Sequence, residues 1–127
     1  MQELYQYILD EIARFEPAIV YHFGSSVEGR ERKDSDLDLA FYSRLDCDPY
    51  EVFTAAQRIA RVVHRDVDLI DLGKAGDVMK AQVIGSGRRI YKGDERAADE
   101  FEMLALSQYA RLNEERREIL ERQGVSL

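Results

Sequence analysis

The strongest constraint on the fold of this chain is the order in which two kinds of apolar pattern alternate along it. Short runs rich in β-branched and aromatic residues predict strands at residues 19–23, 36–41, 67–72 and 88–91. Segments whose apolar residues recur every three or four positions predict helices at residues 3–15, 48–63, 77–84 and 95–122. Helix and strand therefore alternate along the chain, which excludes all-helical and all-strand architectures.

This order predicts an α/β (α+β) fold, with a small mixed sheet of about four strands packed by helices and a long C-terminal helix. It does not by itself give the direction of the strands. We expect a single domain spanning residues 1–127. The polar segment 27–35 is expected to form a short helix followed by a loop.

Local signals predict several helix ends. Asp48 before Pro49 is typical of a capping residue followed by a proline in the first helical turn, and Gly85 is expected to end the short third helix. The last helix is either a cover on the sheet or an arm that reaches a partner. Its predicted inward-facing residues are Phe101, Leu104, Ala105, Leu112 and Ile119.

Composition excludes some classes of function. The formal net charge of −7 argues against broad affinity for nucleic-acid backbones and permits a basic protein partner. No run approaches the roughly 18 apolar residues that span a bilayer, so no membrane association is expected. The N-terminus lacks the features of a secretory signal, and Cys47 is the single cysteine, so we expect a cytoplasmic protein.

The first candidate site feature is Gly24-Ser25, which directly follows a predicted buried strand. Glycine allows close approach of the backbone to a ligand, and the N–H groups and hydroxyl that follow form a natural seat for phosphate oxygens. Turns of this kind are common, however, and the motif alone is typical of an ordinary strand end.

The second feature is a set of carboxylates on two predicted strands. Asp36 and Asp38 are two residues apart, so they share one face of their strand while Leu37 points into the core. Like charges so placed favour a divalent cation such as Mg²⁺ between them, although a solvated turn leading into a half-exposed strand is the alternative. Asp68 lies inside an apolar strand, where aspartate is disfavoured, so it is either at a sheet edge or part of a site. Asp66 shares its face, but Asp66 is expected in a loop.

Taken together, these features resemble a known family. Gly24-Ser25, ten intervening residues, Asp36-x-Asp38 and an Asp in a later strand are similar to the nucleotidyltransferase superfamily named for DNA polymerase β. The pattern looks most like its minimal members, the MNT-type antitoxins of HEPN/MNT toxin–antitoxin pairs. The resemblance covers nearly the whole chain and implies a polymerase β-like nucleotidyltransferase fold.

The resemblance also implies roles for these residues. Asp36 and Asp38 would ligate two Mg²⁺ ions, Asp68 would complete the second metal site, and all three would be catalytic. Gly24 and Ser25 would bind the β- and γ-phosphates of ATP. One departure is Glu28, since many relatives carry a basic residue there; Arg30, Arg32 and Lys33 are nearby.

The function that the resemblance implies is transfer of AMP from ATP to a tyrosine of a cognate HEPN ribonuclease toxin. The toxin would be a stable partner, and no direct nucleic-acid binding is expected. Two alternatives stay open at this point. One is a non-catalytic antitoxin that caps the toxin by binding alone, and the other is a nucleotidyltransferase that modifies a small molecule of the aminoglycoside type.

Overall fold

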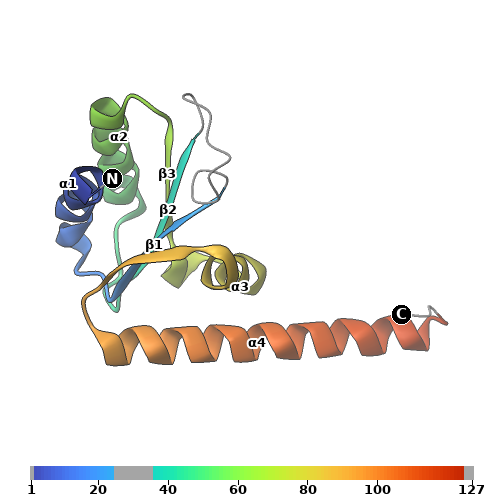
Figure 1. The fold of residues 1–127 in the computed structure, drawn as a ribbon. Coiled ribbons are helices and arrows are strands. Elements are labelled where there is room, and N and C mark those ends of the chain that lie inside the picture. The colour runs from blue at the N-terminus through green and yellow to red at the C-terminus, as the bar shows by residue number, and fades with distance from the viewer. Residues whose placement is uncertain (1, 25–35, 125–127) are drawn as a thin grey trace.

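The computed structural model describes residues 2–24 and 36–124. Ser25 and the predicted short helix within residues 27–35 lie outside the described residues. The helices and strands follow the alternation expected from the sequence (Figure 1): α1 (Gln2–Ile12), β1 (Ile19–Phe23), β2 (Leu37–Tyr42), α2 (Pro49–Val63), β3 (Val67–Asp71), α3 (Asp77–Ser86), β4 (Arg88–Lys92) and α4 (Glu95–Arg122). Two 3₁₀ turns, η1 (Ala13–Phe15) and η2 (Leu72–Lys74), follow α1 and β3.

The four strands form one mixed sheet in the order β3-β2-β1-β4, which confirms the expected architecture. β1 runs antiparallel to both β2 and β4, whereas β2 and β3 are parallel. In this register Phe23 of β1 is opposite Asp38 of β2, and Asp38 is opposite Asp68 of β3. The strands therefore bring together the three segments that carry the sequence motifs.

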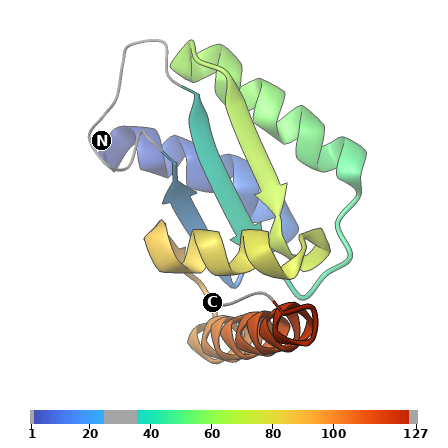
Figure 2. The same cartoon turned by 90° about the vertical axis from the view of Figure 1, so that its right-hand side faces the viewer.

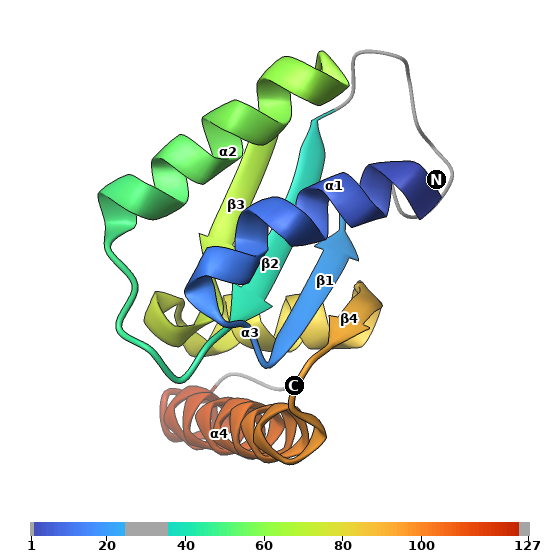
Figure 3. The same cartoon turned by 90° about the vertical axis from the view of Figure 1, so that its left-hand side faces the viewer.

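Helices cover both faces of the sheet (Figures 2 and 3). α1 and α2 lie on one face, above a core cluster that includes Ile8, Ile59, Leu37 and Leu39. α3 and the start of α4 lie on the other face, on a second cluster that includes Ala40. Because side chains alternate along a strand, Asp38 points to the same face as Ala40, which is the α3 and α4 face.

The local signals for helix ends were partly right. Asp48 caps α2 as predicted: its Oδ1 accepts a hydrogen bond of 2.9 Å from the backbone N–H of Tyr50. The predicted end of α3 at Gly85 is wrong, since the helix continues to Ser86. Burial of Val83 and Ile84 holds this last turn in place, and a single exposed glycine weakens a helix by only about 1 kcal/mol.

The long helix α4 is both a cover and an arm. Its buried residues Ala97, Ala98, Phe101 and Ala105 all lie in the N-terminal half, which packs on α3 and the sheet. The prediction that Leu104 and Ile119 face inward is wrong, because they are 58% and 52% exposed. The helix extends well past the sheet, so its C-terminal half has no layer beneath it (Figure 1). Among the described residues, no helix combines the length and apolar character needed to cross a membrane.

Candidate active site

The three predicted carboxylates lie on one face of two adjacent strands. Asp36 is exposed and directly precedes β2, Asp38 is half-buried on β2, and Asp68 is exposed on β3 directly opposite Asp38. Leu37 between the first two is buried in the core on the other face, as expected from strand alternation. Parallel pairing of β2 with β3 is therefore what brings Asp68 to the Asp36–Asp38 pair.

The charges of these groups interact. The pKa of Asp38 is raised, first by burial and then by the negative charges of Asp68 and Asp36, while the positive charge of Arg65 opposes the shift. A carboxylate with two like charges beside it is stabilised by a cation between them. No sequence prediction included Arg65. Its basic side chain, three positions before Asp68, was a signal that could have indicated it.

The donor set suits magnesium by its chemistry. Mg²⁺ prefers carboxylate oxygens together with substrate phosphates, and these carboxylates share one face. Within residues 2–24 and 36–124, however, no three acidic, histidine or cysteine side chains are already gathered as a metal-binding group. The assignment of Asp36, Asp38 and Asp68 as metal ligands stays a prediction.

Gly24 lies against the central carboxylate. Its φ of +79° falls in the left-handed region, and a Cβ atom added there would lie 2.1 Å from Oδ2 of Asp38. Both the backbone conformation and the contact therefore require glycine. The glycine of the Gly-Ser motif and the Asp38 carboxylate are thus parts of one site, whereas Ser25 and Glu28 lie outside the part of the chain that the structure describes.

A polar contact on the same face joins this region to α4. The buried hydroxyl of Tyr21 on β1 donates a 2.8 Å hydrogen bond to Oε2 of Glu102 on α4, and Nε of Arg89 on β4 donates to the same oxygen over 2.9 Å. Burial and the Glu102 charge raise the pKa of Tyr21. No sequence pattern indicated this contact, because Tyr21 and Glu102 are far apart along the chain.

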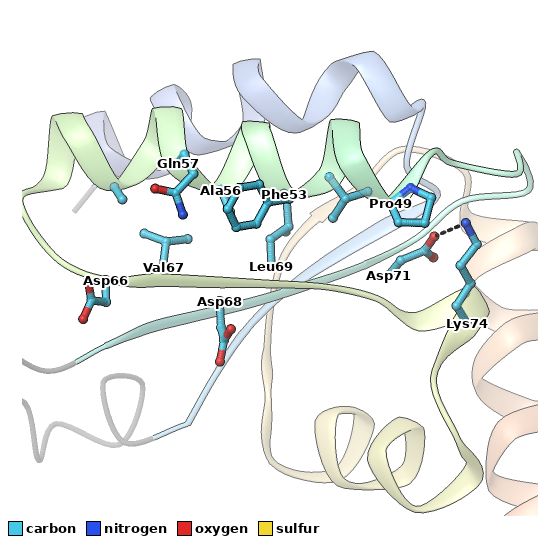
Figure 4. Close-up of a pocket in the computed structure, with 12 residues that line it drawn as sticks. Pro49, Phe53, Ala56, Gln57, Asp66, Val67, Asp68, Leu69, Asp71 and Lys74 are labelled. Atoms are coloured by element: carbon cyan, nitrogen blue, oxygen red, sulfur yellow. Dashed lines mark ion pairs between the residues drawn. The ribbon is translucent and has the colours of Figure 1, made fainter.

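A cleft of about 550 Å³ runs between α2 and β3, on the side of β3 opposite to the Asp68 side chain (Figure 4). We call it the α2–β3 cleft. α2 contributes Phe53, Ala56 and Ala60 among others, and β3 contributes Val67 and Leu69. Asp71 lies at one end and forms an ion pair of 4.0 Å with Lys74. No sequence pattern indicated this cleft.

Comparison with known proteins assigns the fold and the motifs to a family. Residues 6–96, which hold Gly24, Asp36, Asp38 and Asp68, match the family model described as polymerase beta, nucleotidyltransferase. The chain belongs to this nucleotidyltransferase family. The polymerase β-like fold that the sequence resemblance implied is therefore confirmed.

Similar members of the nucleotidyltransferase family indicate a branch within it. The chain is 31% identical over 103 residues to the protein adenylyltransferase MntA of Shewanella oneidensis, covering 81% of this chain and 73% of that protein. It also matches a crystal structure of a toxin–antitoxin with AMP-PNP, with a TM-score of 0.81 and 28% identity, covering 95% of this chain and 98% of the matched chain.

A third match is a tri-AMPylated Shewanella oneidensis HEPN toxin in complex with MNT antitoxin. Its TM-score is 0.78 at 25% identity, and the match covers 98% of both chains. The sequence resemblance to MNT-type antitoxins is confirmed by these comparisons.

Proposed function

We propose that this chain is an antitoxin that transfers AMP from ATP to a tyrosine of a cognate HEPN toxin and thereby neutralises it. The observation that carries this proposal is the pairing of Asp38 with Asp68 on adjacent strands, with Gly24 against Asp38, in a chain similar to MntA over 81% of its length. This arrangement supports the roles that the nucleotidyltransferase resemblance implies for these residues.

In this proposal Asp36, Asp38 and Asp68 hold two Mg²⁺ ions. Ions held there would supply a lower pKa for the acceptor hydroxyl and positive charge beside the α-phosphate. Gly24 and Ser25 bind the β- and γ-phosphates of ATP. The positive φ of Gly24 and its missing side chain let the backbone approach both Asp38 and the triphosphate.

The reaction is a phosphoryl-type displacement with a simple balance of atoms. The tyrosine oxygen forms a bond to the α-phosphorus of ATP, the bond from that phosphorus to the β-phosphate bridge oxygen breaks, and pyrophosphate leaves. The hydroxyl proton passes to solvent. The protein contributes mainly position and charge, because little covalent chemistry is required of it.

The partner is a HEPN toxin in a stable complex. The net charge of −7 complements a basic, RNA-binding surface, and addition of AMP places charge and bulk next to a nuclease site. The buried free Cys47 and the use of ATP suit the cytoplasm.

The test uses the purified chain, labelled ATP, Mg²⁺ and the HEPN protein encoded beside it. Label should appear on a tyrosine of the HEPN protein and should vanish with Asp36→Ala and with Asp38→Ala. Neutralisation that survives both substitutions without label would instead establish a non-catalytic cap. Label on an aminoglycoside and not on the HEPN protein would establish the small-molecule alternative.

A further inference from the structure

The outer edge of β3 has free backbone groups. β3 is the last strand of the sheet on this side, and among the described residues no strand pairs with its outer edge. The N–H of Leu37 bonds to the C=O of Asp66 over 2.8 Å, so the backbone groups of residues 66, 68 and 70 point toward β2. By alternation, the N–H and C=O groups of Val67 and Leu69 point outward, where another strand could pair with them.

α2 extends over this free edge. The helix lies partly over β3 and partly beyond its outer side (Figures 2 and 3). The α2–β3 cleft lies in this position, and Phe53, which lines it, is 58% exposed although α2 is an amphipathic helix packed on the sheet. The apolar face of α2 is therefore wider than the sheet that it covers. A strand added beside β3 would pack beneath Phe53 and Ala60.

The charge along the β3 edge favours a basic occupant. Asp66 and Asp68 carry exposed carboxylates that point away from the cleft along this edge, and Asp71 lies at the end of the cleft, where Lys74 is the single basic residue among those that line it. Lys74 is already engaged, with Nζ 3.3 Å from Oδ1 of Asp46. A segment with Lys or Arg side chains would be attracted to this edge.

The edge is also next to the candidate active site. A residue on an added strand directly opposite Asp68 would project to the same face as Asp68, because paired residues share a face. Neighbouring strands are about 4.8 Å apart, so a tyrosine at that position would lie beside the Asp68 carboxylate, with Asp38 one strand further on. Its neighbours in sequence would point into the α2–β3 cleft.

We propose that the acceptor protein binds to the outer edge of β3 through an extended basic segment, which joins the sheet as a further strand and presents the acceptor tyrosine on the Asp68 face. This inference rests on the proposed function. An added helix would not fit, since a helix satisfies its own backbone groups and leaves the outward groups of Val67 and Leu69 unpaired. An extended segment satisfies them and fills the cleft with alternate side chains.

The first experiment measures steady-state AMP transfer to the HEPN protein. Phe53→Ala removes the exposed ring that lines the cleft and is expected to raise the KM for the HEPN protein about tenfold, which corresponds to about 1.4 kcal/mol. Val62→Ala is the matched control, because Val62 is on the same helix, is 51% exposed and does not line the cleft. Affinity for Mg²⁺ with AMP-PNP should not change in either variant. An unchanged KM with Phe53→Ala would overturn the inference.

A second experiment measures hydrogen bonding of the β3 backbone by amide exchange. Amide hydrogen exchange of Val67 and Leu69 should slow about tenfold or more when the HEPN protein binds without Mg²⁺, because their outward N–H groups become hydrogen-bonded. Leu69→Pro removes one outward N–H without removing a bond to β2, and should weaken transfer while the fold, checked by circular dichroism, persists. Exchange that stays unchanged in a formed complex would overturn the inference.

The two proposals fail separately. If the wild-type chain transfers no AMP, the proposed function fails, and the exchange measurement alone decides whether β3 is a binding edge. If AMP is transferred while Phe53→Ala and the exchange of Val67 and Leu69 show no effect, only the edge inference fails.

Discussion

Gly24 and Asp38 are in direct contact across the β1–β2 pair. Oδ2 of Asp38 occupies the space that a side chain at Gly24 would need, 2.1 Å from the position of an added Cβ atom. Asp38 in turn is opposite Asp68 on the next strand. A change at the glycine therefore displaces the central carboxylate of the candidate site.

Gly24→Ala is expected to abolish most activity. The φ of +79° is strained for alanine, and the new methyl group must push the Asp38 carboxylate away. We expect AMP transfer to the HEPN protein to fall about 100-fold or more and stability to fall by about 1–3 kcal/mol. Activity assays and urea unfolding measure the two effects. Wild-type activity in Gly24→Ala would show that the position of Asp38 is not critical.

Removing a carboxylate is expected to abolish the stabilising effect of magnesium. Mg²⁺ at about ten times its dissociation constant should stabilise the wild-type chain by about 1.4 kcal/mol, seen as a higher melting temperature. Asp38→Asn and Asp68→Asn should lose this response. Without Mg²⁺, Asp38→Asn should melt no lower than wild type, because the pKa of Asp38 is raised by burial and by its acidic neighbours.

The control for that measurement is Asp66→Asn. Asp66 is exposed and shares the strand face of Asp68, but it precedes β3 and does not pair with Asp38. Its variant should keep the response to Mg²⁺. If Asp66→Asn loses the response and Asp68→Asn keeps it, the third ligand has been assigned to the wrong residue.

Tyr21→Phe is expected to lower stability at neutral pH by about 1 kcal/mol, since it removes the hydrogen bond to Glu102. The folded state holds the Tyr21 proton more tightly than the unfolded state, whose tyrosine titrates near pH 10. The wild type should therefore lose stability as pH rises above about 10. The difference in free energy of unfolding between the wild type and Tyr21→Phe should then become smaller. Urea unfolding at pH 8 and pH 11 measures this difference. Tyr50→Phe, at a 71% exposed residue, should behave like wild type at both values.

Ending the chain after Leu112 is expected to leave the folded domain intact. Beyond Leu112 every residue up to Gly124 is exposed except the half-buried Leu120, so the removed segment contributes little to the core. We expect the melting temperature to change by less than about 4 °C and AMP-PNP binding to persist. Loss of cooperative unfolding would contradict the inference that the part of α4 after Leu112 contributes little to the core.

Local patterns in the sequence were enough to predict the helices and strands and part of the candidate site. The 3.6-residue and two-residue apolar periods depend on near neighbours, so they predicted the order of helices and strands and the bounds of α4. Asp48-Pro49 is a local capping signal, and it predicted the start of α2. In the same way, the alternation of Asp36, Leu37 and Asp38 predicted which of these side chains share a face.

Tertiary structure decided the features that depend on contacts between distant segments. Parallel pairing of β2 with β3 placed Asp68 beside Asp38, and antiparallel pairing of β1 placed Gly24 against the same carboxylate. The part of α4 beyond the sheet left Ile119 exposed, and the side on which α4 packs buried Ala105 and left the adjacent Leu104 exposed, where a helical period alone predicted burial of all three. Strand order and helix placement result from long-range packing, which no local pattern encodes, and the free edge of β3 under α2 is a consequence of both.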